Sequence, residues 1–335
     1  MNISAINELN PNFKKHLLKV TQSSDCEEIE IIQTLWSGYG TIARYKLHDS
    51  VHKTVVVKCI ALDQSNTHPR GWNTNLSHER KVKSYQVETH WYEKWNEQCT
   101  EACRTPICLG SYTEGENQWI ILEDLNTHYP LRKQELGIDE VKVCLQWLAH
   151  FHATFLHQKP IGLWETGTYW HLETRPYEFE KIEHADLKAK AHEIDSILNQ
   201  CSYQTIVHGD AKLANFCFSD PLTSQGDPRV AAVDFQYVGG GCGMKDVAYF
   251  LGSCLSSSAC ERYENELLGF YFSVLQKAVA SAQKNINFNA LEQEWRTMYP
   301  IACTDFTRFL LGWMPTHQKI NNYNRRIMGA VLTSM

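Results

Sequence analysis

The sequence changes character near Asn126, and this change constrains the fold more than any other feature. Before Asn126, short runs rich in β-branched and aromatic residues are separated by glycines and other turn formers, as is typical of antiparallel strands. One charged segment, which begins at Ser77, has the apolar spacing of a helix instead. The strand-like runs are residues 28–36, 41–48, 54–60, 105–112 and 117–125. Residues 1–125 are therefore predicted to form an antiparallel sheet with one helix, in the order β-β-β-α-β-β.

After Asn126 the pattern is mainly helical. Apolar residues from Val141 to Phe155 recur at helical spacing and predict a long amphipathic helix that ends near His157. Further helices are predicted around residues 180–200, 245–283, 288–299 and 303–314, with short strands only within 204–218 and 229–236 and a surface loop at 219–229. With a length of 335 residues, this predicts an α+β protein of two lobes, residues 1–125 and residues 126–335.

Composition excludes several classes of protein. The net charge is −6 and no block of like charge stands out, so nucleic acid is not an expected partner. No apolar run approaches the roughly 18 residues that a membrane span needs, and the first residues lack the pattern of a signal peptide. A cytoplasmic protein is expected, with its 12 scattered cysteines reduced. Because the spacing of Cys99, Cys103 and Cys108 does not form two metal-binding pairs, no zinc is expected.

The strongest local signal is His208-Gly209-Asp210, with Asn215 five residues after the aspartate and Asp234 at the end of the next short strand. Phosphoryl transfer needs a carboxylate that accepts the proton of the attacking hydroxyl, and metal ions that neutralise the phosphates. Two acids and an amide supply one proton acceptor and two oxygen ligands, which suit Mg²⁺.

These motifs resemble the kinase-fold small-molecule phosphotransferases, a group that includes aminoglycoside phosphotransferases, choline kinases and ecdysteroid kinase-like (CHK-like) proteins. The pairing of Glu123-Asp124-Leu125 with the two later motifs leans towards the ecdysteroid kinase-like branch. The resemblance implies a bilobal protein-kinase-like fold that uses ATP and Mg²⁺. It implies that Asp210 is the catalytic base, that Asn215 and Asp234 are the Mg²⁺ ligands, and that His208 orients the loop.

The resemblance extends into the first 125 residues. It implies that Lys58, at the end of a Val-Val-Val run, contacts the nucleotide phosphates and pairs with Glu88 on the first helix. Taken singly, each of these two residues is more often a solvated surface charge. It also implies that Glu123 and Leu125 form a hinge whose backbone hydrogen-bonds adenine. As pure pattern, that segment is a strand that runs into a polar turn.

Gly38 and Gly40 lie between two predicted strands, where a glycine turn lets backbone N–H groups approach phosphates. A third glycine is missing from this turn, so a plain hairpin is an equal alternative. The glycine run at residues 239–243 lacks the context of a phosphate cradle and is predicted to be a flexible turn.

Three other residues receive structural or secondary roles. His152 is expected to be a satisfied core histidine. Lys212 occupies the place of the catalytic-loop lysine of eukaryotic protein kinases, so it either touches the γ-phosphate or is a solvated loop lysine. Asp246 is expected to cap a helix or to brace the catalytic loop. The segment between Asp234 and Asp246 is too short for a peptide platform and no Ala-Pro-Glu triplet closes it, which favours a small-molecule hydroxyl as the acceptor.

The acceptor itself is left open. Residues 164–177 and 305–313 are unusually aromatic and would suit a choline-like cation or a flat, sterol-like alcohol, while an amino sugar follows from the wider group. Packing within a helical lobe would explain the same aromatic residues. A catalytically inactive nucleotide-binding scaffold of the same fold is the alternative function.

Overall fold

The computed structural model describes residues 9–35, 38–61, 75–222 and 228–335. The chain divides into two compact units. The first comprises Met1–Glu97 and Pro106–Thr127, and the second comprises Gln98–Thr105 and His128–Met335. The assignment of nucleotide binding to one part of the chain and catalysis to the other stays a prediction.

The first unit is built on a five-stranded antiparallel sheet in the order β1-β2-β3-β5-β4. Its strands are β1 (Asp25–Thr34), β2 (Gly40–His48), β3 (Thr54–Ala61), β4 (Cys108–Glu114) and β5 (Asn117–Glu123). All five follow predicted runs. In β2 and β3 alternate side chains are buried, which fixes the face that each strand turns to the core, whereas almost every residue of the edge strand β1 is exposed. The short 3₁₀ turns η2 (Asn96–Gln98) and η4 (Leu125–Thr127) lie near the ends of this unit's segments, while η3 (Glu101–Cys103) belongs to the second unit.

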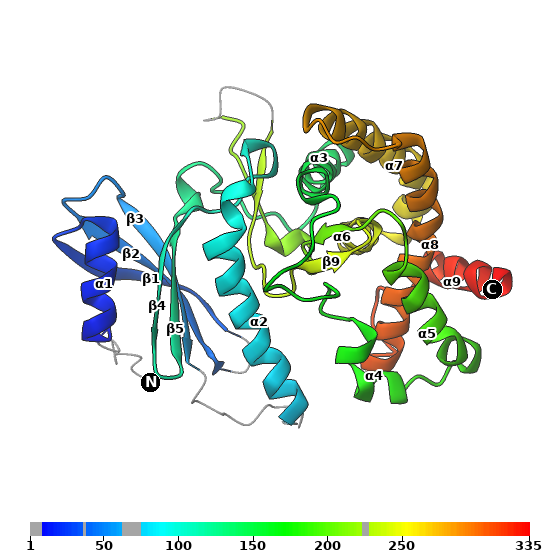
Figure 1. The fold of residues 1–335 in the computed structure, drawn as a ribbon, viewed down its shortest axis with the longest axis horizontal. Helices are drawn as coiled ribbons and strands as arrows, with labels where there is room; N and C mark the ends of the chain where they lie inside the picture. Colours follow the sequence, from blue (N-terminus) through cyan, green and yellow to red (C-terminus); the bar gives the residue numbers. More distant parts are fainter. Residues whose placement is uncertain (1–8, 36–37, 62–74, 223–227) are drawn as a thin grey trace. The chain divides into compact units, whose positions relative to one another are not determined.

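Two helices pack on this sheet, α1 (Pro11–Thr21) and α2 (Asn75–Lys94), and they lie on opposite faces of it (Figure 1). Phe13 and Leu17 of α1 are fully buried against Val57 and Trp119 of the sheet. Successive side chains of a strand point to opposite faces, so Lys58 faces α2. The one predicted helix is α2, and α1 is an addition.

The second unit is mainly helical, as predicted (Figure 1). Helices α3 (Ile138–Phe155) and α7 (Ser257–Ser281) pack against each other, and α6 (Met244–Cys254) packs against α8 (Phe288–Trp313). The remaining helical segments are η5 (Leu172–Thr174), α4 (Pro176–Glu180), α5 (Ala185–Asn199), η6 (Leu213–Asn215) and α9 (Asn322–Ser334). No helix in the described ranges is both long and apolar enough to cross a membrane.

Several boundaries differ from the prediction. The single helix expected over 245–283 is two helices, because Ser256 caps α7 by accepting a hydrogen bond from the Ala259 N–H. The two helices expected on either side of Pro300 are one helix, α8, whose buried face holds it together across the proline. Helix α9 was not predicted. Part of the loop expected at 219–229 lies outside the described residues.

Two small antiparallel ladders carry the motif residues of the second unit: β6 (Thr205–Val207) pairs with β9 (Gly239–Gly241), and β7 (Phe216–Phe218) pairs with β8 (Val230–Ala232). The prediction of a flexible turn at 239–243 is therefore wrong for its first three residues. The glycines serve close packing: a Cβ on Gly239 would lie 2.2 Å from the carbonyl oxygen of Trp164. Only glycine admits the segment of Trp164 beside this strand.

Candidate active site

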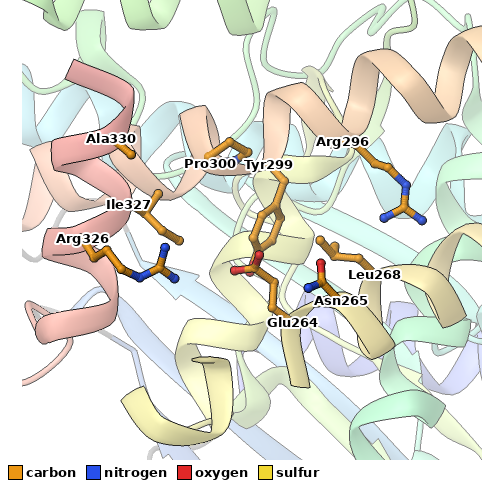
Figure 2. Close-up of a pocket in the computed structure, with 9 residues that line it drawn as sticks. All are labelled: Glu264, Asn265, Leu268, Arg296, Tyr299, Pro300, Arg326, Ile327 and Ala330. Atoms are coloured by element: carbon orange, nitrogen blue, oxygen red, sulfur yellow. The ribbon is translucent and has the colours of Figure 1, made fainter. Parts of the chain in front are cut away.

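One open hollow in the second unit contains none of the predicted site residues. It has a volume of about 310 Å³ and lies among α7, α8 and α9 (Figure 2). Two arginines line it, Arg296 and Arg326, and each pairs with a glutamate, Glu292 and Glu261 respectively. Because both charges are already compensated, the hollow offers no evident anion site.

The predicted catalytic loop joins β6 to β7 and is braced from beneath by Asp246 of α6. The Asp246 carboxylate accepts hydrogen bonds from the backbone N–H groups of His208, at 2.6 Å, and Gly209, at 2.9 Å. It also contacts Nε2 of His152 at 3.1 Å, and Nδ1 of His152 lies 2.8 Å from the Tyr271 hydroxyl. All of these groups are buried, so the predictions of a bracing Asp246 and a satisfied His152 are confirmed.

Gly209 makes the loop's sharp turn possible. Its φ is +80°, and a Cβ at this position would lie 2.0 Å from the carbonyl oxygen of Tyr237. Both the left-handed backbone and the close approach require glycine. Next to it, Nδ1 of His208 accepts the Asp210 N–H at 3.2 Å, which leaves Nε2 to donate to the carbonyl oxygen of Val233 at 3.1 Å. One neutral tautomer satisfies both bonds, and it ties the loop to the segment that carries Asp234.

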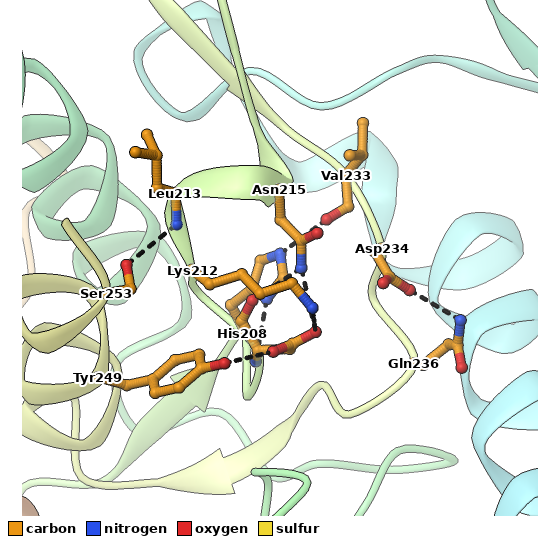
Figure 3. Close-up of polar contacts among 10 residues, drawn as sticks. His208, Lys212, Leu213, Asn215, Val233, Asp234, Gln236, Tyr249 and Ser253 are labelled. Atoms are coloured by element: carbon orange, nitrogen blue, oxygen red, sulfur yellow. Dashed lines mark hydrogen bonds and ion pairs between the residues drawn. The ribbon is translucent and has the colours of Figure 1, made fainter. Parts of the chain in front are cut away.

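Three side chains hold the carboxylate of Asp210 in one orientation. Tyr249 donates to Oδ1 at 3.0 Å, while Lys212 and Asn215 donate to Oδ2 at 2.8 and 3.2 Å (Figure 3). Burial opposes the charge of Lys212, yet Asp210 and Asp234 hold the pKa of its ammonium above the usual value. Lys212 is thus an ion-pair partner of Asp210, and the alternative of a simply solvated lysine is not what the structure has.

The pairing of β7 with β8 places the two predicted metal ligands, Asn215 and Asp234, on neighbouring segments of the backbone. The N–H of Val233 donates to the carbonyl oxygen of Asn215 at 3.0 Å, so Asp234 follows directly from a residue paired with Asn215. Asp234 has a φ of +71°, a left-handed conformation that a non-glycine residue adopts at a cost of about 1 kcal/mol. Its Oδ1 accepts from Gln236 at 2.8 Å (Figure 3).

In the first unit, Lys58 and Glu88 form a buried ion pair, with Nζ and Oε2 2.6 Å apart. Their side chains are only 5% and 1% exposed, so the alternative of solvated surface charges is excluded for both. The ring of Tyr85, one helical turn before Glu88, lies 5.7 Å from the ammonium. The sheet and α2 therefore enclose the side chain of Lys58, and the contacts with Glu88 and Tyr85 fix the position of its ammonium.

The other predicted nucleotide residues also lie in the first unit. The N–H of Gly38 donates to the carbonyl oxygen of Leu35 at 3.1 Å, and Gly40 accepts from the Leu35 N–H at 2.8 Å, as in a hairpin connection. Ser37, in the same turn, lies outside the described residues. Glu123 ends β5, where its N–H donates to Ile107, and Leu125 is buried in η4. Whether these four residues bind nucleotide stays a prediction.

Two residues at the site were missed from the sequence, Tyr249 and Lys319. Tyr249 lies three residues after Asp246 on α6, so the helical spacing of these two residues could have placed both beside the loop. Lys319 lies before α9, and no motif signals it. Its ammonium stands 5.0 Å from the centre of the Tyr249 ring.

Comparisons with known proteins bear on this arrangement. Residues 168–284 match the sequence model of the ecdysteroid kinase-like family. The whole chain resembles the solved structure of a microcompartment-associated aminopropanol kinase, with a TM-score of 0.52, 13% sequence identity, and coverage of 96% of this chain and 94% of that one. The chain has a kinase-like fold. The resemblance stated from the motifs is confirmed, and the family match spans Asp210, Asn215 and Asp234.

A second solved structure, described as a fructosamine-3-kinase from Haemophilus somnus 129PT, is similar with a TM-score of 0.43 and 11% identity over 96% of both chains. No curated protein sequence matches the chain. At 13% identity the likeness to the aminopropanol kinase establishes the fold, and the chemistry must be argued from the site itself.

Proposed function

We propose that the protein is an ATP- and Mg²⁺-dependent phosphotransferase that moves the γ-phosphate to a hydroxyl of a small molecule. The observation that carries this proposal is the fixed carboxylate of Asp210, whose two oxygens are oriented by Tyr249, Lys212 and Asn215. A base held in one orientation can take the proton of an acceptor hydroxyl as that hydroxyl attacks. The ammonium of Lys212 balances the negative charge of Asp210 next to the bond that forms between the hydroxyl and the phosphate.

The donor set suits a magnesium ion. Asn215 spends its Nδ2 amide on Asp210, and its Oδ1 accepts no hydrogen bond from any group in the described part of the chain. The carboxylate of Asp234 and this amide oxygen are hard oxygen donors. Bound there, Mg²⁺ would neutralise phosphate charge. Lys58, positioned by Glu88, would hold the nucleotide phosphates, together with the predicted residues Gly38, Gly40, Glu123 and Leu125.

The test is phosphate transfer from ATP to a panel of alcohols, with and without Mg²⁺. We expect Asp210→Asn to lower kcat by about 10²-fold or more with little change in ATP affinity, because the amide cannot accept a proton. Asp234→Asn should weaken Mg²⁺ dependence as well as turnover. Asp186→Asn, on the exposed start of α5, is the matched control and should behave as wild type.

The alternative, an inactive nucleotide-binding scaffold, makes a different prediction. It would bind ATP and turn over none of the alcohols, and Asp210→Asn would change nothing. The three bonds that orient Asp210 favour the enzyme, because a scaffold has no need of a positioned base.

A further inference from the structure

The two aromatic stretches noted in the sequence meet in the second unit. Tyr169, Trp170, Tyr249, Phe306 and Phe309, called here the aromatic wall, pack on one another mainly edge to face. Four of the five are less than 10% exposed, the exception being Tyr169. The wall is therefore mostly packed core, and few of its ring faces remain for a bound cation.

The remaining faces already carry cations of the protein itself. The ammonium of Lys319 lies 5.0 Å from the ring centre of Tyr249 and 5.7 Å from that of Phe306. The guanidinium of Arg175 lies 5.3 Å from the ring of Phe309. A cation over an aromatic face occupies the position that a quaternary amine would take in an aromatic cage.

Lys319 differs from Arg175 and Lys212, two other cations beside the aromatic wall and Asp210, in its charge balance. Arg175 pairs with Glu178, and Lys212 pairs with Asp210. By contrast, no carboxylate of the described residues lies within 4 Å of the Lys319 ammonium. Burial lowers the pKa of Lys319, while the charge of Asp210 acts in the opposite direction and that of Lys212 adds to the lowering. Lys319 thus places a hydrogen-bond donor without an ion-pair partner close enough to Asp210 for the two charges to interact.

A short path connects this donor to the chemistry. Lys319 covers the ring of Tyr249, and the hydroxyl of the same tyrosine donates to Asp210 at 3.0 Å. An acceptor whose hydroxyl reaches Oδ1 of Asp210 therefore lies next to the Tyr249 ring, and the face of that ring is already covered by Lys319.

We propose that Lys319 determines acceptor specificity: it disfavours alcohols with a positive charge beside the hydroxyl and stabilises those with an anionic or oxygen-bearing group there. The inference rests on the proposed phosphotransfer function, and it selects against the choline-like class. A cationic acceptor would face the repulsion of the ammonium and find its aromatic surface occupied, whereas a carboxylate or a second hydroxyl would gain a hydrogen bond.

The test compares three primary alcohols of similar size: choline, its neutral carbon isostere dimethylbutanol, and the anionic hydroxypivalate. Dissociation constants are measured by calorimetry on wild type, Lys319→Met and Lys319→Arg, with Mg²⁺ and a non-hydrolysable ATP analogue present. In wild type we expect choline to bind at least about tenfold more weakly than dimethylbutanol, with hydroxypivalate the tightest. Lys319→Met should remove most of this difference, and Lys319→Arg, which keeps the charge, should preserve it.

Three results would overturn the inference. Wild type would bind choline as tightly as dimethylbutanol, or the ratio of their dissociation constants would be the same in Lys319→Met as in wild type, or none of the three alcohols would bind. Phosphate transfer from Mg²⁺-ATP, measured on the same samples, separates the two proposals. The expected order of binding without transfer would contradict the phosphotransferase and leave the role of Lys319 standing. Transfer with no effect of Lys319→Met on acceptor preference would contradict the role of Lys319 alone.

Discussion

At the scale of single residues, Asp246 links the helical core to the predicted catalytic loop. Its carboxylate accepts from two consecutive backbone N–H groups, those of His208 and Gly209, and contacts His152. An asparagine has one acceptor oxygen, so Asp246→Asn must turn an amide N–H₂ towards a backbone donor in a fully buried position. We expect the free energy of unfolding to fall by about 1–3 kcal/mol and turnover to fall with it.

Urea denaturation and the kinetics of phosphate transfer check this prediction. Asp186→Asn again controls for the loss of one negative charge on the second unit. Wild-type stability and turnover in Asp246→Asn would show that the loop holds its shape without this bracing.

The residues predicted for the loop and its neighbouring strand share one property: they belong to short motifs that can be recognised in the sequence. Asp210 and Asn215 are five residues apart on one loop, and Asp234 lies two residues after the end of β8. Lys319 could not be predicted. Its position beside Tyr249 depends on how the segment before α9 packs against α6, and no local sequence pattern indicates that contact. Its relevance is a property of the packed structure.

At the scale of elements, β9 shows how a glycine run can be a strand. The predicted turn assumed that glycines in series are flexible, whereas here a Cβ at Gly239 would collide with the backbone of Trp164. We expect Gly239→Ala to destabilise the protein by more than about 1 kcal/mol, because backbone at 2.2 Å must shift rather than a side chain.

Gly252 provides the matched control. It lies within α6, and a Cβ there would meet nothing within 4 Å. Gly252→Ala should stabilise the protein by about 0.5–1 kcal/mol, since alanine favours helix more than glycine does. Urea midpoints of the two variants should therefore move in opposite directions, and a shift in the same direction would contradict this account of β9.

The helices that the sequence did not predict were missed for a local reason. In α1 only Phe13, Leu17 and Thr21 are buried, so its apolar pattern is too sparse to stand out from the charged residues around it. Its start is nevertheless encoded: the side chain of Asn10 accepts from two backbone N–H groups, and Pro11 occupies the first helical position. The Asn10 cap and Pro11 mark where α1 begins, but without a clear apolar stripe after them the sequence does not predict a helix.

At the scale of the whole molecule, each unit has a core of its own. Phe13 stacks on Trp119 in the core of the first unit, at 5.0 Å between ring centres, and Leu275 of α7 is fully buried in the second. Truncation to alanine should cost about 3–5 kcal/mol for Phe13 and about 2–5 kcal/mol for Leu275. With separate cores, the loss should be felt first in the unit that carries the substitution.

The cysteines allow this to be measured unit by unit. Burial raises the pKa of Cys59 and of Cys108, both in the first unit, to about 11, and that of Cys217, in the second, to about 11. An exposed thiol has a pKa of about 8.5, so at pH 8 unfolding raises the thiolate fraction by about two orders of magnitude. Because the thiolate is the reacting form, alkylation at pH 8 reports the opening of each unit.

We expect Phe13→Ala to accelerate alkylation of Cys59 and Cys108 far more than that of Cys217, and Leu275→Ala to do the reverse. Mass spectrometry of peptides after timed alkylation gives all three rates in one experiment, and wild type provides the baseline. Full unfolding in urea should make the three rates equal, since burial alone separates them from an ordinary thiol. If either variant accelerates all three thiols alike under native conditions, the two units unfold as one, and the separate cores do not confer separate stability.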